Sequence, residues 1–292
     1  MKIISFDIEE WYIEKKFNGA RQEKYQEFDR YLKMILDLLD ETNTKATFFC
    51  LGKIAAEFPE VVKTIAEKGH EIGCHSDVHL WLTKMAPVML KEDTHRAMSS
   101  LQDVIGQRVI SYRAPAFSIG ENNKWAIEVL VSEGIERDAS IFPARRDFGG
   151  FENFPTASPA IVKYNGYSIK EFPICMTRVL NNKVAYSGGG YFRLFPYSFV
   201  KKNMSKSDYA IAYFHIGDLL HDSHGLMSKK EYEEYFKEAG TLKNRIVRYV
   251  KSSIGTKTAF DKMAKLMQNV EFVSLSQADA MTDWASVDCI DL

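Results

Sequence analysis

The sequence lacks an excess of charge of either sign, because 38 lysines and arginines nearly balance 39 aspartates and glutamates. A chain with almost no net charge has no general field with which to gather a polyanion, so we expect no nucleic-acid partner. Among its 292 residues 46% are apolar and 26% are charged, a composition that excludes disorder and suffices for one large core.

Long apolar runs are also missing. No segment approaches the roughly eighteen uncharged apolar residues of a membrane span. The N-terminus reaches an acidic cluster by Asp7, which is too early for the apolar core and cleavage site of a signal peptide. We therefore expect a soluble, cytoplasmic protein.

Cysteine is scarce. Cys50, Cys74, Cys175 and Cys289 are scattered, and no Cys-x-x-Cys spacing occurs. That spacing is the usual sign of a cysteine metal site, whereas isolated cysteines in apolar runs are usually reduced core residues. We expect core thiols here rather than disulfides or a zinc cluster.

What the sequence does contain is an alternation of short apolar runs with amphipathic segments, the pattern of parallel strands joined by covering helices. The expected strands are residues 2–7, 46–51, 71–74, 109–112, 135–140, 209–214 and 271–275. The expected helices are residues 25–41, 60–68, 91–105, 123–133 and most of 229–268. This α/β repeat favours a barrel or an open parallel sheet.

Between residues 143 and 196 the alternation breaks into short strand-like pieces and glycine-rich turns. No linker flanks this stretch, so we interpret it as an irregular insertion of loops and hairpins within one domain spanning 1–292. Residues 229–292 then supply the C-terminal helices and the last strand.

Two histidines, His75 and His79, follow the expected strand at 71–74. In a helical turn positions i and i+4 share a face, so both imidazoles can reach one cation. A carboxylate completes three protein ligands and leaves a position for water, and the first strand ends on Asp7, Glu9 and Glu10. An isolated histidine pair is more often an ordinary loop feature.

Three further polar residues favour the functional interpretation. Arg113, Asp138 and His215 each fall where a barrel strand would open onto the active face. Together with Asp7 and the two histidines they stand in five short segments: Ser5-Phe6-Asp7, His75-Ser76-Asp77-Val78-His79, Arg113-Ala114-Pro115-Ala116-Phe117, Asp138-Ala139-Ser140 and Phe214-His215.

In order and spacing these segments resemble the five motifs of the polysaccharide deacetylases, also called the NodB-homology or carbohydrate esterase family 4 group. The resemblance covers roughly residues 1–220 and implies a distorted (β/α) barrel of about seven parallel strands. The Asp-x-Glu-Glu-Trp motif and residues 188–193 are similar to the branch associated with bacterial surface-polysaccharide gene clusters.

The resemblance also implies roles for single residues. The implied catalytic residues are Asp7 as the base, Arg113 as the arginine that holds it, His215 as the catalytic histidine and Asp138 as the acid that tunes His215; the implied metal ligands are Glu9, His75 and His79. The metal would be divalent, with zinc expected and cobalt or nickel also compatible. Glu9 stands where the family commonly has an aspartate, and its extra methylene puts metal binding in question.

These roles predict a metal-dependent hydrolase that removes an N-acetyl group from an amino sugar during O-antigen, capsule or exopolysaccharide biosynthesis. The amino sugar would be nucleotide-linked or lipid-linked. Two alternatives stay open. One is a deformylase acting on a formamido sugar, and the other is a metal-free barrel that only binds glycans or a partner of the pathway.

Two weaker patterns lie in the C-terminal part. Between residues 232 and 268 basic residues flank an apolar stripe, as in a peripheral helix on an anionic leaflet, although such a stripe more commonly packs on the protein itself. His221 and His224, near Asp218 and Asp222, offer a second cluster of possible ligands, although a polar loop is the more common arrangement.

Overall fold

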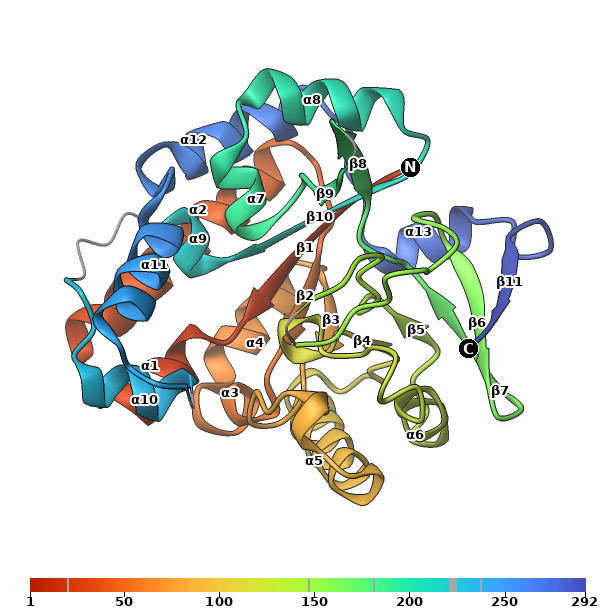
Figure 1. Ribbon diagram of the computed structural model, residues 1–292, viewed down its shortest axis with the longest axis horizontal. Helices are drawn as coiled ribbons and strands as arrows, with labels where there is room; N and C mark the ends of the chain where they lie inside the picture. The colour runs from red at the N-terminus through yellow and green to blue at the C-terminus, as the bar shows by residue number, and fades with distance from the viewer. Residues whose placement is uncertain (20, 147, 181, 221–224, 237) are drawn as a thin grey trace.

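A computed structural model describes the chain except for residues 20, 147, 181, 221–224 and 237. Its centre is a nine-stranded sheet in the order β10-β1-β2-β3-β4-β5-β7-β6-β11, and β8 and β9 form a separate hairpin (Figure 1). The strands are β1 (Lys2–Ile8), β2 (Thr47–Cys50), β3 (Glu71–Cys74), β4 (Ser111–Tyr112), β5 (Arg137–Asp138), β6 (Ala160–Tyr164), β7 (Tyr167–Glu171), β8 (Met176–Val179), β9 (Asn182–Ala185), β10 (Ala210–His215) and β11 (Asp288–Asp291).

Every neighbouring pair from β10 to β7 is parallel, while β6 is antiparallel to β7 and parallel to β11. The predicted α/β fold with about seven parallel strands is therefore confirmed. The order has two ends, β10 and β11, and no strand pairing within the described part of the chain joins them.

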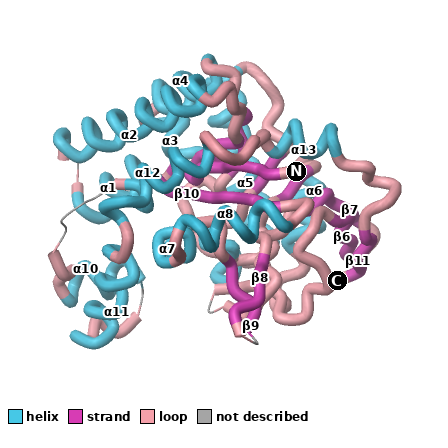
Figure 2. The backbone as a smooth tube through the Cα atoms, turned by 90° about the horizontal axis from the view of Figure 1, so that it is seen from above, coloured by secondary structure: helices cyan, strands magenta, loops and turns pink. Residues whose placement is uncertain are grey.

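Helices are arranged around the central strands (Figure 2). They are α1 (Glu10–Asn18), α2 (Gln22–Glu41), α3 (Gly52–Glu57), α4 (Pro59–Glu67), α5 (Pro87–Ile105), α6 (Ala126–Ser132), α7 (Gly189–Leu194), α8 (Tyr197–Lys206), α9 (Ile216–Leu219), α10 (Lys229–Phe236), α11 (Leu242–Ser253), α12 (Thr256–Met267) and α13 (Leu275–Met281). Of the helices that the structure describes, none is long and apolar enough to cross a membrane.

Local sequence explains where several helices begin and end. Pro59 and Pro87 open α4 and α5, where the missing N–H of proline costs no helical hydrogen bond. Gly106 ends α5 in the left-handed conformation, and its N–H donates to the carbonyl of Gln102. These signals match the predicted boundaries of both helices to within a few residues.

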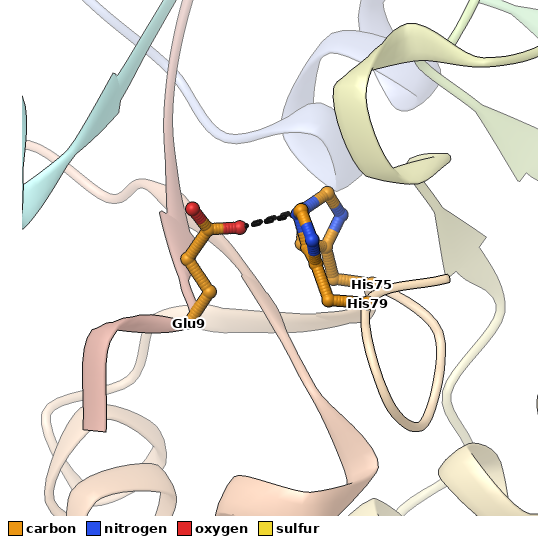
Figure 3. A group of neighbouring side chains, drawn as sticks. All are labelled: Glu9, His75 and His79. Atoms are coloured by element: carbon orange, nitrogen blue, oxygen red, sulfur yellow. Dashed lines mark ion pairs between the residues drawn. The ribbon is translucent and has the colours of Figure 1, made fainter. Parts of the chain in front are cut away.

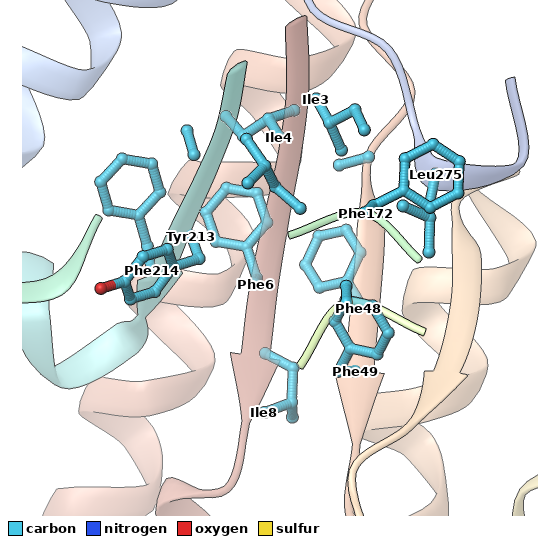
Figure 4. Packing of buried hydrophobic residues seen from close by; sticks show 14 of the residues in the cluster. Ile3, Ile4, Phe6, Ile8, Phe48, Phe49, Phe172, Tyr213, Phe214 and Leu275 are labelled. Carbon is cyan, nitrogen blue, oxygen red and sulfur yellow. The ribbon is translucent and has the colours of Figure 1, made fainter. Parts of the chain in front are cut away.

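The core is built around β1, which is buried on both of its faces, as is usual for a central parallel strand. Ile3, Ile4, Phe6 and Ile8 are almost fully inaccessible. Figure 4 shows the side chains of this strand packing among residues of β2 and β10. The rings of Phe6 and Phe48 stack with their centroids 4.9 Å apart. This packing fixes the strand ends on which the polar motif residues lie.

The stretch from 143 to 196 is more regular than predicted. It contains β7, the last strand of the parallel series, and the helix α7, where only loops and hairpins were expected. The β6–β7 hairpin reverses at Asn165 and Gly166, which both have positive φ. Ile169 and Glu171 of β7 are buried beside β5.

The prediction of a last strand at residues 271–275 is wrong. Only Val273 pairs with the sheet, through a single bridge to Ile3. Ser274 then begins α13 with a capping box to Gln277, which ends the extended segment. The final strand is β11. Among the cysteines, Cys50, Cys74 and Cys175 are buried free thiols as expected, whereas Cys289 is exposed.

Candidate active site

Asp7 lies near the end of β1 and is held by Arg113, which follows β4. Nη1 of Arg113 is 2.8 Å from Oδ1 of Asp7 and also donates to Oγ of Ser5, at 2.9 Å. Nε of Arg113 donates to the carbonyl of Ala139, and the guanidinium lies 4.2 Å from the ring centroid of Phe49. Because Asp7 and Arg113 are both buried, this ion pair fixes the direction of the carboxylate.

Glu9, His75 and His79 converge on one another (Figure 3). Oε2 of Glu9 is 2.6 Å from Nε2 of His79 and 3.6 Å from Nε2 of His75. One ligand atom from each residue lies within 4.8 Å of the other two. Burial raises the pKa of Glu9, but the neighbouring His79 and His215 outweigh burial and hold it well below its usual value. Glu9 is therefore present as a carboxylate.

The tautomer of His75 tests whether these residues fit a cation. Nδ1 of His75 lies 2.7 Å from the backbone carbonyl of Arg113, and a carbonyl only accepts, so Nδ1 carries the proton. In the neutral ring Nε2 then carries the lone pair, and this atom is buried without a hydrogen-bond partner among the described residues. Two imidazoles and one carboxylate suit zinc and other divalent ions. The residues present fit such a metal.

The backbone between His75 and His79 is a loop rather than the helical turn that the sequence suggested. Ser76 and His79 both have positive φ, and Oγ of Ser76 accepts the N–H of His79. The N–H of Asp77 donates to the buried carboxylate of Asp93 on α5. The loop, and not helical periodicity, brings the second histidine back towards Glu9.

His215 ends β10 on the opposite side of Asp7. Its Nε2 is 3.8 Å from Oδ2 of Asp7 and 3.8 Å from Oε1 of Glu9. Its Nδ1 is 2.8 Å from Oδ2 of Asp218, which also accepts the N–H of His215. Burial lowers the pKa of His215, but the carboxylates of Glu9, Asp218 and Asp7 outweigh it and raise the pKa well above its usual value. These three carboxylates favour the protonated form of the imidazole.

Asp138 does not contact His215, so the expected tuning role is wrong. The acid on the His215 ring is Asp218, which in turn lies 3.2 Å from Nε of Arg193. Asp138 is buried behind Arg113 and contacts Ser140 and Glu171. A strand only two residues long ends at Asp138, and the side chain is fully buried.

Six of the seven predicted residues thus converge, and Asp138 lies beneath them. Sequence reasoning missed Asp218 and Arg193 as supports of His215. The available signal was the spacing, since Asp218 stands three residues after His215 and shares its helical turn. Glu10, the third carboxylate considered as a ligand, instead accepts the N–H of Gly217. His221, His224 and Asp222 lie outside the described residues.

Two family models match the chain. Residues 23–136 match the polysaccharide deacetylase family. The chain contains a polysaccharide deacetylase domain. Residues 139–280 match a domain of unknown function, DUF3473.

Relatives agree with the deacetylase domain. A peptidoglycan-N-acetylglucosamine deacetylase of Bacillus cereus is 42% identical over 100 residues, which are 32% of this chain and 34% of that protein. One of Listeria monocytogenes is 35% identical over 96 residues, 33% of this chain and 20% of that protein. The match therefore spans about a third or less of the length of these relatives.

A crystal structure from Mycobacterium smegmatis, assigned to the polysaccharide deacetylases, aligns with a TM-score of 0.64 at 17% identity. The alignment covers 100% of this chain and 92% of that one. At this identity the likeness concerns the fold, which is shared along the whole chain.

The site draws on both matched segments. His75, His79 and Arg113 lie within the deacetylase domain, whereas Arg193, His215 and Asp218 lie within the segment of unknown function. The second segment also supplies β7 and β10 to the sheet. It therefore contributes residues to the candidate site and strands to the same sheet as the deacetylase domain.

Proposed function

We propose that the chain is a metal-dependent N-deacetylase that hydrolyses the acetamide of an amino sugar during bacterial surface-polysaccharide biosynthesis. One observation carries the proposal. A buried carboxylate, an imidazole paired with Asp218 and a three-residue ligand group meet at one strand edge, with Nε2 of His215 3.8 Å from both Asp7 and Glu9. An acid, a base and an electrophile at one point are what amide hydrolysis requires.

A divalent cation held by Glu9, His75 and His79 would supply Lewis acidity, which polarises a carbonyl and makes water more acidic. Asp7 accepts the proton of the attacking water while the new C–O bond forms, and the carbonyl electrons move onto oxygen. Arg113 fixes the direction of the Asp7 carboxylate through the ion pair between them.

His215 completes the reaction. When the C–N bond breaks, the protonated imidazole donates its Nε2 proton to the departing nitrogen, so the products are acetate and a free amine. Asp218 holds Nδ1 and stabilises the cation until the transfer. General acid and base steps of this kind each contribute roughly 10²- to 10⁴-fold to a rate.

The test is acetate release from N-acetylglucosamine substrates by protein loaded with zinc, cobalt or nickel. Metal content is measured in parallel for the wild type, His75→Ala and His79→Ala. His95→Ala is the matched control, because His95 is exposed and pairs with Glu133 away from the site. We expect about one metal per chain in the wild type and control, and loss of metal and activity in the two site variants.

Two other outcomes of this experiment would favour the alternative functions. Formate in place of acetate would make the protein a deformylase. A wild type that binds no metal and releases neither acid would contradict the proposal and favour a glycan-binding or pathway-assembly role.

A further inference from the structure

A cavity of about 790 Å³ opens from the active site, and its charges are segregated. The described carboxylates that line it are Asp7, Glu9 and Asp218, and each already contacts a cationic or histidine partner in the site. The lining cations are Lys16, Lys84, Arg146, Arg248 and Lys251. Away from the catalytic residues no described carboxylate lines this wall, although Arg248 pairs with Glu238, which is not a lining residue.

Among these cations, Arg146 gives the clearest indication that the wall binds an anion. Its guanidinium lies 4.4 Å from the ring centroid of Phe142 and 5.5 Å from that of Phe117, both on the active-site side of the sheet. No carboxylate of a described residue pairs with it, and Nη1 is buried without a hydrogen-bond partner among those residues. An arginine held in place by two rings, with an unused donor, is suited to bind an anion in the cavity.

An aromatic pair stands beside these cations. The rings of Trp81 and Phe148 are 4.2 Å apart and both line the cavity. Nζ of Lys84 lies 4.3 Å from the centroid of Trp81, and the guanidinium of Arg248 lies 5.8 Å from that of Phe148. The wall thus combines flat apolar surface with positive charge, a combination that suits a sugar ring linked to phosphate.

We propose that this wall is an anion subsite that binds the phosphate or diphosphate to which the amino sugar is attached. The inference rests on the proposed function and names its substrate class, a glycosyl phosphate or diphosphate rather than a neutral glycan. Arginine recognises phosphate oxygens through two parallel hydrogen bonds, and the partly enclosed cavity strengthens such contacts. A neutral oligosaccharide would offer no charge to the guanidinium of Arg146, which no carboxylate of a described residue pairs with.

The experiment compares kcat/KM for deacetylation of three substrates: UDP-N-acetylglucosamine, a polyprenyl-diphosphate-linked N-acetylglucosamine and the neutral N-acetylglucosamine trimer. We expect one or both diphosphates to be preferred, and the arm that is faster identifies a nucleotide or lipid source. Arg146→Gln should lower the ratio of diphosphate to neutral kcat/KM roughly 10- to 100-fold, as loss of a charged hydrogen bond predicts.

Two further variants sharpen the result. Arg145→Gln is the matched control, since Arg145 is exposed, adjacent in sequence and absent from the cavity wall, and its ratio should equal that of the wild type. Arg146→Lys keeps the charge and should recover part of the preference. A thermal melt of each variant identifies any that fails to fold.

Calorimetry with the same diphosphates separates this inference from the proposed function, because binding does not require turnover. Tight binding that weakens in Arg146→Gln supports the subsite even if no acetate is released. Equal kcat/KM for the neutral and diphosphate substrates, or an equal effect of Arg146→Gln on all three, would overturn it.

Discussion

Asp218 Oδ2 is shared by two donors of one residue, the Nδ1 and the backbone N–H of His215, at 2.8 and 3.1 Å. This double contact fixes the imidazole and supports its charge. Asp218→Asn should keep the backbone contact but remove the negative charge, so the pKa of His215 should fall. The proposed mechanism requires the protonated imidazole, so the alkaline decline of kcat/KM should move to lower pH.

The same variant should lower kcat roughly 10- to 100-fold, in line with the loss of other supporting carboxylates. Metal content should not change, because Asp218 is not a ligand. Asp283→Asn, on a turn remote from the site, serves as the control. An Asp218→Asn profile that coincides with that of the wild type would remove Asp218 from the mechanism.

The ion pair between Asp7 and Arg113 leads to a prediction about stability as well as activity. Asp7→Asn should abolish proton abstraction and reduce kcat by roughly 10²- to 10⁴-fold. It also leaves a buried arginine without its ionised partner, a change that costs about 3 to 5 kcal/mol in comparable pairs. Urea unfolding measures the cost, and Ser5→Ala, which removes the hydroxyl contacts to Arg113 and to the carbonyl of Ala212 but no charge, should cost less.

Some residues of the candidate site could be predicted from the sequence and others could not, for physical reasons. Strand-end polar residues such as Asp7 and His215 could be predicted, because a parallel strand presents its C-terminal residues at one edge and an apolar run marks the strand. The partner of His215 could not be read from the motifs. Whether Asp138 or Asp218 reaches the imidazole depends on side-chain direction at the end of a two-residue strand, which local patterns do not encode.

Similarly, β7 was hidden because only Ile169 and Glu171 of its side chains are fully buried, one of them charged. A short strand with a glutamate among its buried residues does not show the apolar pattern by which strands are predicted. Its place in the sheet depends on the long-range contact between Glu171 and Asp138, which no local period reports. By contrast, the capping box of Ser274 and Gln277 can be recognised in the sequence. It marks the start of α13, a helix that begins where a strand was predicted.

The contact between Glu171 and Asp138 predicts a pH-dependent stability. Oε2 of Glu171 and Oδ2 of Asp138 are buried and have no other hydrogen-bond partner among the described residues, so one proton between the two carboxyl groups satisfies both. Burial, and then the charge of Asp138, raise the pKa of Glu171 well above its usual value, and burial raises the pKa of Asp138 to about 6. The folded chain therefore keeps a proton that the unfolded chain releases near pH 4.

The sign follows from this proton difference. The protonated pair adds to the free energy of unfolding in full below the pKa that these carboxyl groups have in the unfolded chain. That addition is lost as pH rises through their raised pKa in the folded chain. Glu171→Gln cannot lose that proton, and its amide still accepts from the N–H of Ile141. Unfolding free energies measured from pH 5 to 9 should therefore fall more steeply for the wild type, by about 1.4 kcal/mol per unit of pKa separation. Glu136→Gln is the exposed control, and parallel curves for the wild type and Glu171→Gln would exclude a shared proton.

The apolar stripe between residues 232 and 268 is buried on one helix and exposed on another. On α12 it packs on the protein, with Ala259, Met263 and Leu266 buried, as the commoner explanation holds. That explanation is wrong for α11, which has no buried residue. Its exposed large apolar residues are Leu242, Ile246, Val247, Tyr249 and Val250.

An anionic membrane surface is the occupant that the charges of α11 favour, because Lys243, Arg245, Arg248 and Lys251 accompany its exposed apolar face. Each basic residue near such a surface contributes about 1 kcal/mol. The chain should therefore sediment with phosphatidylglycerol vesicles but not with neutral vesicles. The double variant Val247→Ser and Val250→Ser should weaken this binding, whereas Val88→Ser, which removes an exposed valine from α5, should not.

Binding in this manner would also place the cavity at the leaflet, since Arg248 and Lys251 of α11 line its wall. A lipid-linked diphosphate would then reach the anion subsite from the membrane, whereas a nucleotide-linked one would have no need of the vesicle. Adding anionic vesicles should accordingly raise kcat/KM for the lipid-linked substrate alone. Equal recovery in the supernatant with both vesicle types would remove the membrane contact, and a dimer that dissociates in the double valine variant would assign the α11 face to a second copy of the chain.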